Sequence, residues 1–126
     1  MADKQSYTLS DDITGSNHMI SITIYKSPEG SYQGFQVIGH ADSVDEGADL
    51  VCCSVSVLTI NTVNSIEAFT SDSFGFEEDD ETGLVELIFD GKPSPEAELL
   101  MKSYEMGVLS IADEYDTWLN VITKEV

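Results

Sequence analysis

The chain has 126 residues, of which 41% are hydrophobic and 23% are charged, and these values are ordinary for one folded globular domain. Acidic residues number 24 against five basic ones, so the formal net charge is -19. Direct binding to nucleic acid or to an anionic membrane is disfavoured, because both need many basic side chains, whereas a basic partner is favoured. Acidity that serves only solubility is the alternative.

The only two cysteines, Cys52 and Cys53, are adjacent in sequence. Vicinal cysteines rarely meet disulfide geometry, so we expect reduced thiols. The opening residues do not resemble a secretory signal, and no window approaches the roughly 18 apolar residues of a membrane span. We therefore expect a cytoplasmic protein. The cysteines and histidines lack zinc-site spacing, so we expect no metal and no cofactor.

Residues 1–18 are polar and aperiodic, and we expect a flexible N-terminal extension ahead of a single domain at 19–126. From Ile20 to about Tyr25, apolar and polar residues alternate as in a half-buried strand. The turn residues Ser27–Gly30 and a second strand at about 32–38 complete a predicted hairpin.

A helix is predicted from about Leu50 to Phe69, with Asp49 as its N-cap, because apolar residues recur at spacings of three and four. A second hairpin is predicted from strands at about 74–77 and 84–89. Ser94, followed by proline, predicts the start of a last helix that runs to about Thr117 or beyond. Its apolar stripe is predicted to include Leu100, Tyr104, Val108, Ile111, Tyr115, Trp118 and Ile122. The predicted fold is α+β, in the order ββαββα, with a four-stranded, mainly antiparallel sheet packed with two helices.

Two side chains suggest acyl-transfer chemistry. His40 follows the second predicted strand, and Cys52 falls in the first turn of the predicted helix, where free N–H groups stabilise a thiolate. A thiolate and an imidazole suffice for attack on a carbonyl and protonation of the leaving amine. Ser56, one turn after Cys52, could help to stabilise an oxyanion. A small buried cysteine and a structural histidine are the alternatives.

The stretches Gly39-His40-Ala41 and Gly47-Ala48-Asp49-Leu50-Val51-Cys52, followed by Ser56, resemble the signature of the Prp family of ribosomal-processing cysteine proteases (YsxB-like). The resemblance covers about residues 19–122. It implies a cysteine endopeptidase that removes a short N-terminal extension from a large-subunit ribosomal protein, cutting after paired aromatic residues, and that forms a homodimer. By the same resemblance, His40 is the base and Cys52 the nucleophile, supported by Gly39, Gly47, Asp49 and Ser56.

Two other hypotheses stay open. A non-catalytic protein could use the same acidity to hold a basic ribosomal protein during assembly. A thiol redox protein built on Cys52 and Cys53 is the other, although the pair lacks C-x-x-C geometry.

Overall fold

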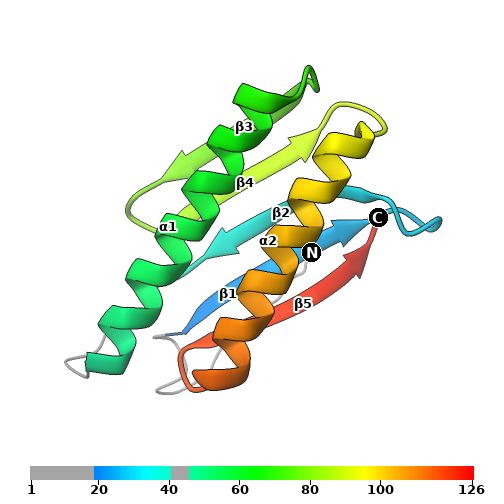
Figure 1. Ribbon diagram of the computed structural model, residues 1–126. Helices are drawn as coiled ribbons and strands as arrows, with labels where there is room; N and C mark the ends of the chain where they lie inside the picture. The colour runs from blue at the N-terminus through cyan, green and yellow to red at the C-terminus, as the bar shows by residue number, and fades with distance from the viewer. Residues whose placement is uncertain (1–18, 41–45) are drawn as a thin grey trace.

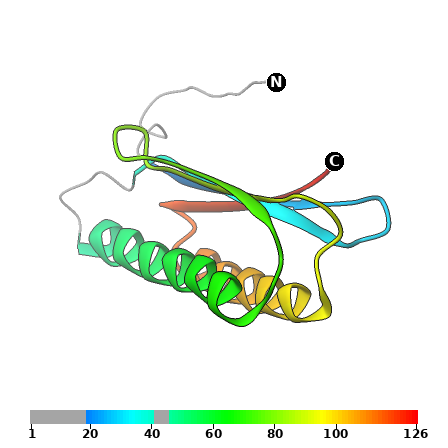
Figure 2. The same cartoon turned by 90° about the horizontal axis from the view of Figure 1, so that it is seen from above.

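The computed structural model describes residues 19–40 and 46–126, so the expected extension at 1–18 and the segment 41–45 lie outside the described part. The elements follow in the order β1 (Ile20–Lys26), β2 (Tyr32–Ile38), α1 (Glu46–Phe69), β3 (Phe74–Asp79), β4 (Leu84–Phe89), α2 (Pro95–Glu114) and β5 (Leu119–Glu125). They form one five-stranded sheet in the order β3-β4-β2-β1-β5 (Figure 1). Both helices lie on the same face of that sheet (Figure 2).

Both predicted hairpins are confirmed. β1 pairs with β2, and β3 pairs with β4, each in antiparallel orientation. The alternation in β1 has its expected result, because Ile20, Ile22 and Ile24 are buried beneath the helices. Gly30 takes a φ of +87° in the β1–β2 turn, a conformation that glycine adopts at little cost.

The C-terminal end of the predicted fold is wrong. α2 ends at Glu114, and the residues from Leu119 onward form β5, which pairs with β1 in parallel. The sheet is therefore five-stranded and mixed rather than four-stranded and mainly antiparallel. Without β5, β1 would be an edge strand, and Leu119, now 2% exposed, would lose its place in the core.

The start of the first helix also differs from the prediction. α1 begins at Glu46, so Asp49 lies inside the first turn and is not the N-cap. Cys52 accordingly lies in the second turn. Helix-dipole effects fall off within the first turn, and Cys52 lies beyond that turn.

The helices pack on the sheet and on each other. α1 buries Val51, Val55 and Ile66, so this helix is part of the core, although its length and composition alone would allow a membrane span. Its contact with α2 is close at Gly107, where a Cβ atom would lie 2.6 Å from Leu58. The predicted cap of α2 is confirmed, since the Ser94 hydroxyl accepts a hydrogen bond from the backbone N–H of Ala97.

Candidate active site

A pocket of about 270 Å³ lies between α1, the ends of β1 and β2, and the β3–β4 hairpin. Its lining contains both predicted catalytic residues, His40 and Cys52, together with Gly39 and Ser56. The remaining lining residues are Ile20, Val37, Val55, Thr59, Ile60, Glu78, Asp79, Asp80, Gly83, Leu84 and Val85. Four of the predicted site residues, which come from two separate segments, therefore meet at one cavity.

His40 leaves the end of β2 through Gly39. Gly39 has a φ of +96°, and a Cβ atom there would lie only 2.5 Å from the carbonyl oxygen of Met19. A side chain at position 39 would therefore be strained by its backbone and would also collide with the start of β1. The chain can turn out of the sheet at this point because residue 39 is glycine, and the turn presents His40, which is exposed, to the pocket.

Cys52 comes to the pocket from α1. It is half-buried and has a free thiol, whereas the free thiol of Cys53 is exposed on another side of the helix and does not line the pocket. Ser56 lies one turn further along α1 and lines the same cavity. The α-helical spacing thus separates the two vicinal cysteines and brings Cys52 and Ser56 to one face.

Two supporting residues from the sequence analysis are not among the lining residues. Gly47 is the second residue of α1, and Asp49 lies one turn before Cys52 with its side chain exposed. Asp49 cannot cap α1, so any contribution that it makes to the site does not come from capping.

The β3–β4 hairpin forms a wall of the pocket that no sequence motif predicts. Its acidic residues Glu78, Asp79 and Asp80 all line the cavity, next to His40 and Cys52. In the sequence this acidic turn is only the loop of the predicted second hairpin. The pairing of β4 with β2 is what carries it to the site, and no local pattern reveals that pairing.

A hydrogen-bonded pair of hydroxyls lies at the buried side of the pocket. Thr59, two turns after Cys52, is 2% exposed, and its Oγ1 lies 2.9 Å from the hydroxyl oxygen of Tyr104 on α2. Burial raises the pKa of Tyr104 well above its usual value, so its hydroxyl stays protonated at any physiological pH. The pair connects the wall of the pocket to the second helix.

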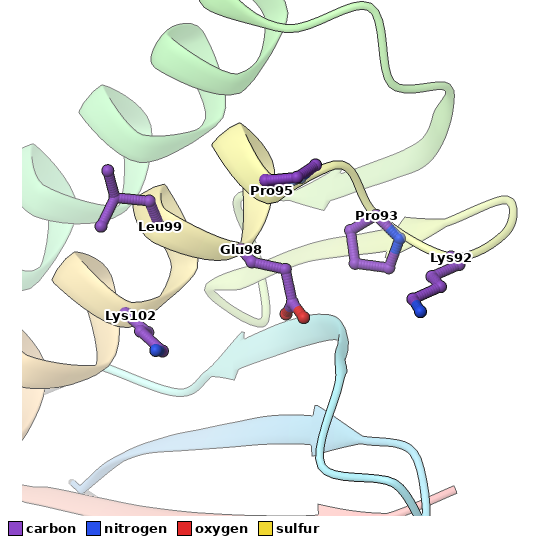
Figure 3. Close-up of a pocket in the computed structure, with 6 residues that line it drawn as sticks. All are labelled: Lys92, Pro93, Pro95, Glu98, Leu99 and Lys102. Atoms are coloured by element: carbon purple, nitrogen blue, oxygen red, sulfur yellow. The ribbon is translucent and has the colours of Figure 1, made fainter.

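Among the residues that the structure describes, no group of three or more His, Cys, Asp or Glu side chains is placed to hold a metal ion. A second hollow lies at the start of α2, lined by Lys92, Pro93, Pro95, Glu98, Leu99 and Lys102 (Figure 3). Its carboxylate, Glu98, already accepts hydrogen bonds from the Ser31 hydroxyl and the Tyr32 backbone N–H. The lining has no thiol, hydroxyl or imidazole side chain, so we place the candidate site at the Cys52 pocket.

Comparison with known proteins gives a family of cysteine proteases. The family model described as "Cysteine protease Prp" matches residues 19–120. The ribosomal processing cysteine protease Prp of Staphylococcus aureus is 29% identical over 98 residues, which cover 78% of this chain and 92% of that protein. The protein of the same name from Bacillus subtilis is 27% identical over 109 residues, covering 83% of this chain and 97% of that protein.

The fold is also similar to a solved structure. The crystal structure of an essential ribosomal processing protease Prp from S. aureus, in complex with a substrate peptide, matches with a TM-score of 0.78 and 26% identity. The match covers 84% of this chain and 100% of that chain. The five-stranded mixed sheet with two helices is thus shared with that protease.

Proposed function

The chain belongs to the Prp family of cysteine proteases, and we propose that it is an endopeptidase in which Cys52 is the nucleophile and His40 the general base. The observation that most supports this assignment is their position at one pocket. The two residues come from the end of β2 and the second turn of α1, and both line the same 270 Å³ cavity.

The proposed reaction is acyl transfer to a thiol. His40 takes the proton of Cys52, and the thiolate attacks the scissile carbonyl to form a tetrahedral intermediate. The protonated imidazole gives its proton to the leaving amine as the C–N bond breaks, and a thioester remains on Cys52. Water, deprotonated by His40, then hydrolyses the thioester. Ser56 lines the cavity one turn from Cys52, and its hydroxyl is a candidate donor to the oxyanion.

The proposed substrate is a large-subunit ribosomal protein, from which the enzyme removes a short N-terminal extension in the cytoplasm. Ribosomal proteins are basic, and three acidic residues of the hairpin, Glu78, Asp79 and Asp80, line the pocket. The apolar residues of the lining, such as Val37, Val55 and Leu84, suit the apolar side chains of an extension with paired aromatic residues.

A vicinal pair of cysteines offers a matched test. Cys52→Ala should abolish cleavage of a peptide that spans the processing site, whereas Cys53→Ser should keep most of the activity, because the Cys53 side chain lies outside the pocket. Circular dichroism and urea unfolding would show whether both variants remain folded. An inactive Cys53→Ser variant beside an active Cys52→Ala variant would overturn the assignment of the nucleophile.

The acidic hairpin also favours a second candidate, a non-catalytic partner that holds a basic ribosomal protein during assembly. Such a protein needs the carboxylates but not the thiol. If the wild type and both cysteine variants bind the basic protein equally and none of them cleaves it, this second function replaces the first.

We also propose that the protein acts as a homodimer through the outer face of α2. Leu99, Met106 and Leu109 are all exposed on this helix, at 68%, 67% and 47%. Their spacing places them along one side of the helix, where a second copy would cover them.

A further inference from the structure

The β3–β4 turn makes three backbone-mediated contacts with the segment that carries His40. The backbone N–H of Gly39 donates to the carbonyl oxygen of Thr82 at 2.9 Å. Nε2 of His40 lies 3.4 Å from the carbonyl oxygen of Glu81. Gly83 lies against both Gly39 and the imidazole ring. These contacts join residues that are about 40 positions apart in the chain.

From these contacts we propose that the β3–β4 turn positions the catalytic imidazole, with the Glu81 carbonyl holding the ring and Gly83 providing the space that the ring occupies. The inference rests on the proposed role of His40 as the general base. It assigns a role in the reaction to a turn that supplies only backbone atoms to the histidine.

The contact with Glu81 selects one tautomer of the neutral imidazole. A carbonyl oxygen can only accept a hydrogen bond, so Nε2 must carry the hydrogen in this contact. In the neutral ring, Nδ1 is then the unprotonated nitrogen and the one that can take the proton of Cys52. A hydrogen bond at one ring nitrogen commonly decides whether the other nitrogen carries a hydrogen. The 3.4 Å distance is long, as catalytic hydrogen bonds often are before substrate binds.

Gly83 explains why the turn can approach so closely. Its φ is +70°, and a Cβ atom there would lie 2.4 Å from the Gly39 carbonyl oxygen and 3.0 Å from Cε1 of His40. A methyl group would therefore push the turn away from both, and the imidazole would lose the carbonyl that holds it. The effect should fall on the chemical step, because misplacing a catalytic group by about 1 Å can cost roughly 100-fold in rate.

Gly30 is a matched control for the conformational strain of placing alanine at a positive φ. It lies in the β1–β2 turn with a similar φ of +87°, and no described atom beyond Gly30 and its two chain neighbours lies within 4 Å of the position of its Cβ. Gly30→Ala and Gly83→Ala should therefore destabilise the fold for the same conformational reason, but only Gly83→Ala disturbs His40.

The first test compares kinetics of the two variants on the peptide used for Cys52. Gly83→Ala should lower kcat by about 10-fold to 100-fold with KM changed by less than about twofold, whereas Gly30→Ala should leave both near the wild-type values. A Gly83→Ala variant with wild-type kcat would overturn the inference, as would equal losses of kcat in the two variants.

The second test does not need activity, and it separates this inference from the proposed function. Long-range ¹H–¹⁵N correlation spectra of folded Cys52→Ala protein at alkaline pH should show His40 with its hydrogen on Nε2, and His18→Gln identifies the signals of the only other histidine. In Cys52→Ala/Gly83→Ala protein, the two ring forms should be mixed. A hydrogen on Nδ1 in the Cys52→Ala protein would refute the positioning role. Absence of cleavage by the wild type would instead count against the proposed function.

Discussion

Removing one oxygen atom, by Tyr104→Phe, tests how the second helix supports the wall of the pocket. The ring would stay in place, because it packs against Phe35 with centroids 4.6 Å apart, but the hydroxyl of Thr59 would lose its partner. Thr59 is 2% exposed, so water cannot readily replace the lost bond. Leaving a buried polar group unpaired costs about 1–3 kcal/mol, and we expect a loss of unfolding free energy in that range.

A double-mutant cycle isolates the hydrogen bond itself. Thr59→Val keeps the shape of the side chain and removes its hydroxyl, so each single variant leaves one polar group unpaired and the double variant leaves none. The double variant should therefore lose about 1 kcal/mol less than the sum of the two single losses. Urea unfolding followed by circular dichroism measures all four proteins, with equal m-values as a check that the denatured states are comparable. Strictly additive losses would refute the pairing.

The dependence of folding stability on pH above pH 10 gives an independent check on Tyr104. Burial holds its pKa above the value of about 10 that the residue has in the unfolded chain. The unfolded state therefore releases a proton near pH 10 that the folded state keeps. Stability from this residue is full below pH 10 and is lost as the pH rises above it. Tyr104→Phe should accordingly flatten the fall in stability between about pH 10 and 11, and an unchanged slope would mean that burial does not raise the pKa of Tyr104.

Three further outcomes are expected. Association with an intact basic substrate should weaken steeply as the salt concentration rises, whereas cleavage of a short apolar peptide should change little. An equal dependence on salt for the two substrates would mean that the acidity serves only solubility. Sedimentation equilibrium at micromolar concentration should show a dimer that Met106→Glu weakens, and a lone 13.8 kDa species would reject dimerisation. A hydrogen bond from the Ser94 hydroxyl lowers the pKa of Asp72, so its stabilising effect should be present above about pH 4 and be lost below it. In urea unfolding, Asp72→Asn should reduce the fall in stability below about pH 4, and an unchanged fall would contradict the pairing of Asp72 with Ser94.

Local chemistry in the sequence predicted most of the fold correctly. The alternation from Ile20 to Ile24 and the Ser94 cap depend on neighbouring residues alone, and both appear as expected. β5 was missed because Trp118 and Ile122 continue the helical spacing of α2, and no glycine or proline marks the break after Glu114. What decides the outcome there is a parallel pairing with β1, a strand about 100 residues earlier in the chain.

Some features of the candidate site can also be predicted from the local sequence, and others arise only when distant strands pair. His40 and Cys52 could be found from a motif, because the chemistry of their side chains shows in the sequence. The contacts of the β3–β4 turn could not, because a carbonyl oxygen belongs to every residue and the close approach at Gly83 arises only when β4 pairs with β2. The start of α1 was misplaced because Asp49 has the chemistry of a cap, yet the helix begins three residues earlier.

One of the two edge strands, β3, pairs on one side only, and its last three residues, Glu77, Glu78 and Asp79, are exposed carboxylates. An unpaired strand edge invites a second chain to add to the sheet, and charged side chains on that edge oppose it. A copy of the same molecule would bring the same negative charges, so edge-to-edge aggregation is resisted at neutral pH. That resistance should fade as the pH approaches the isoelectric point of about 4.1, where protonation removes the repulsion. The acidity proposed to attract a basic substrate therefore also keeps the sheets of separate molecules from joining.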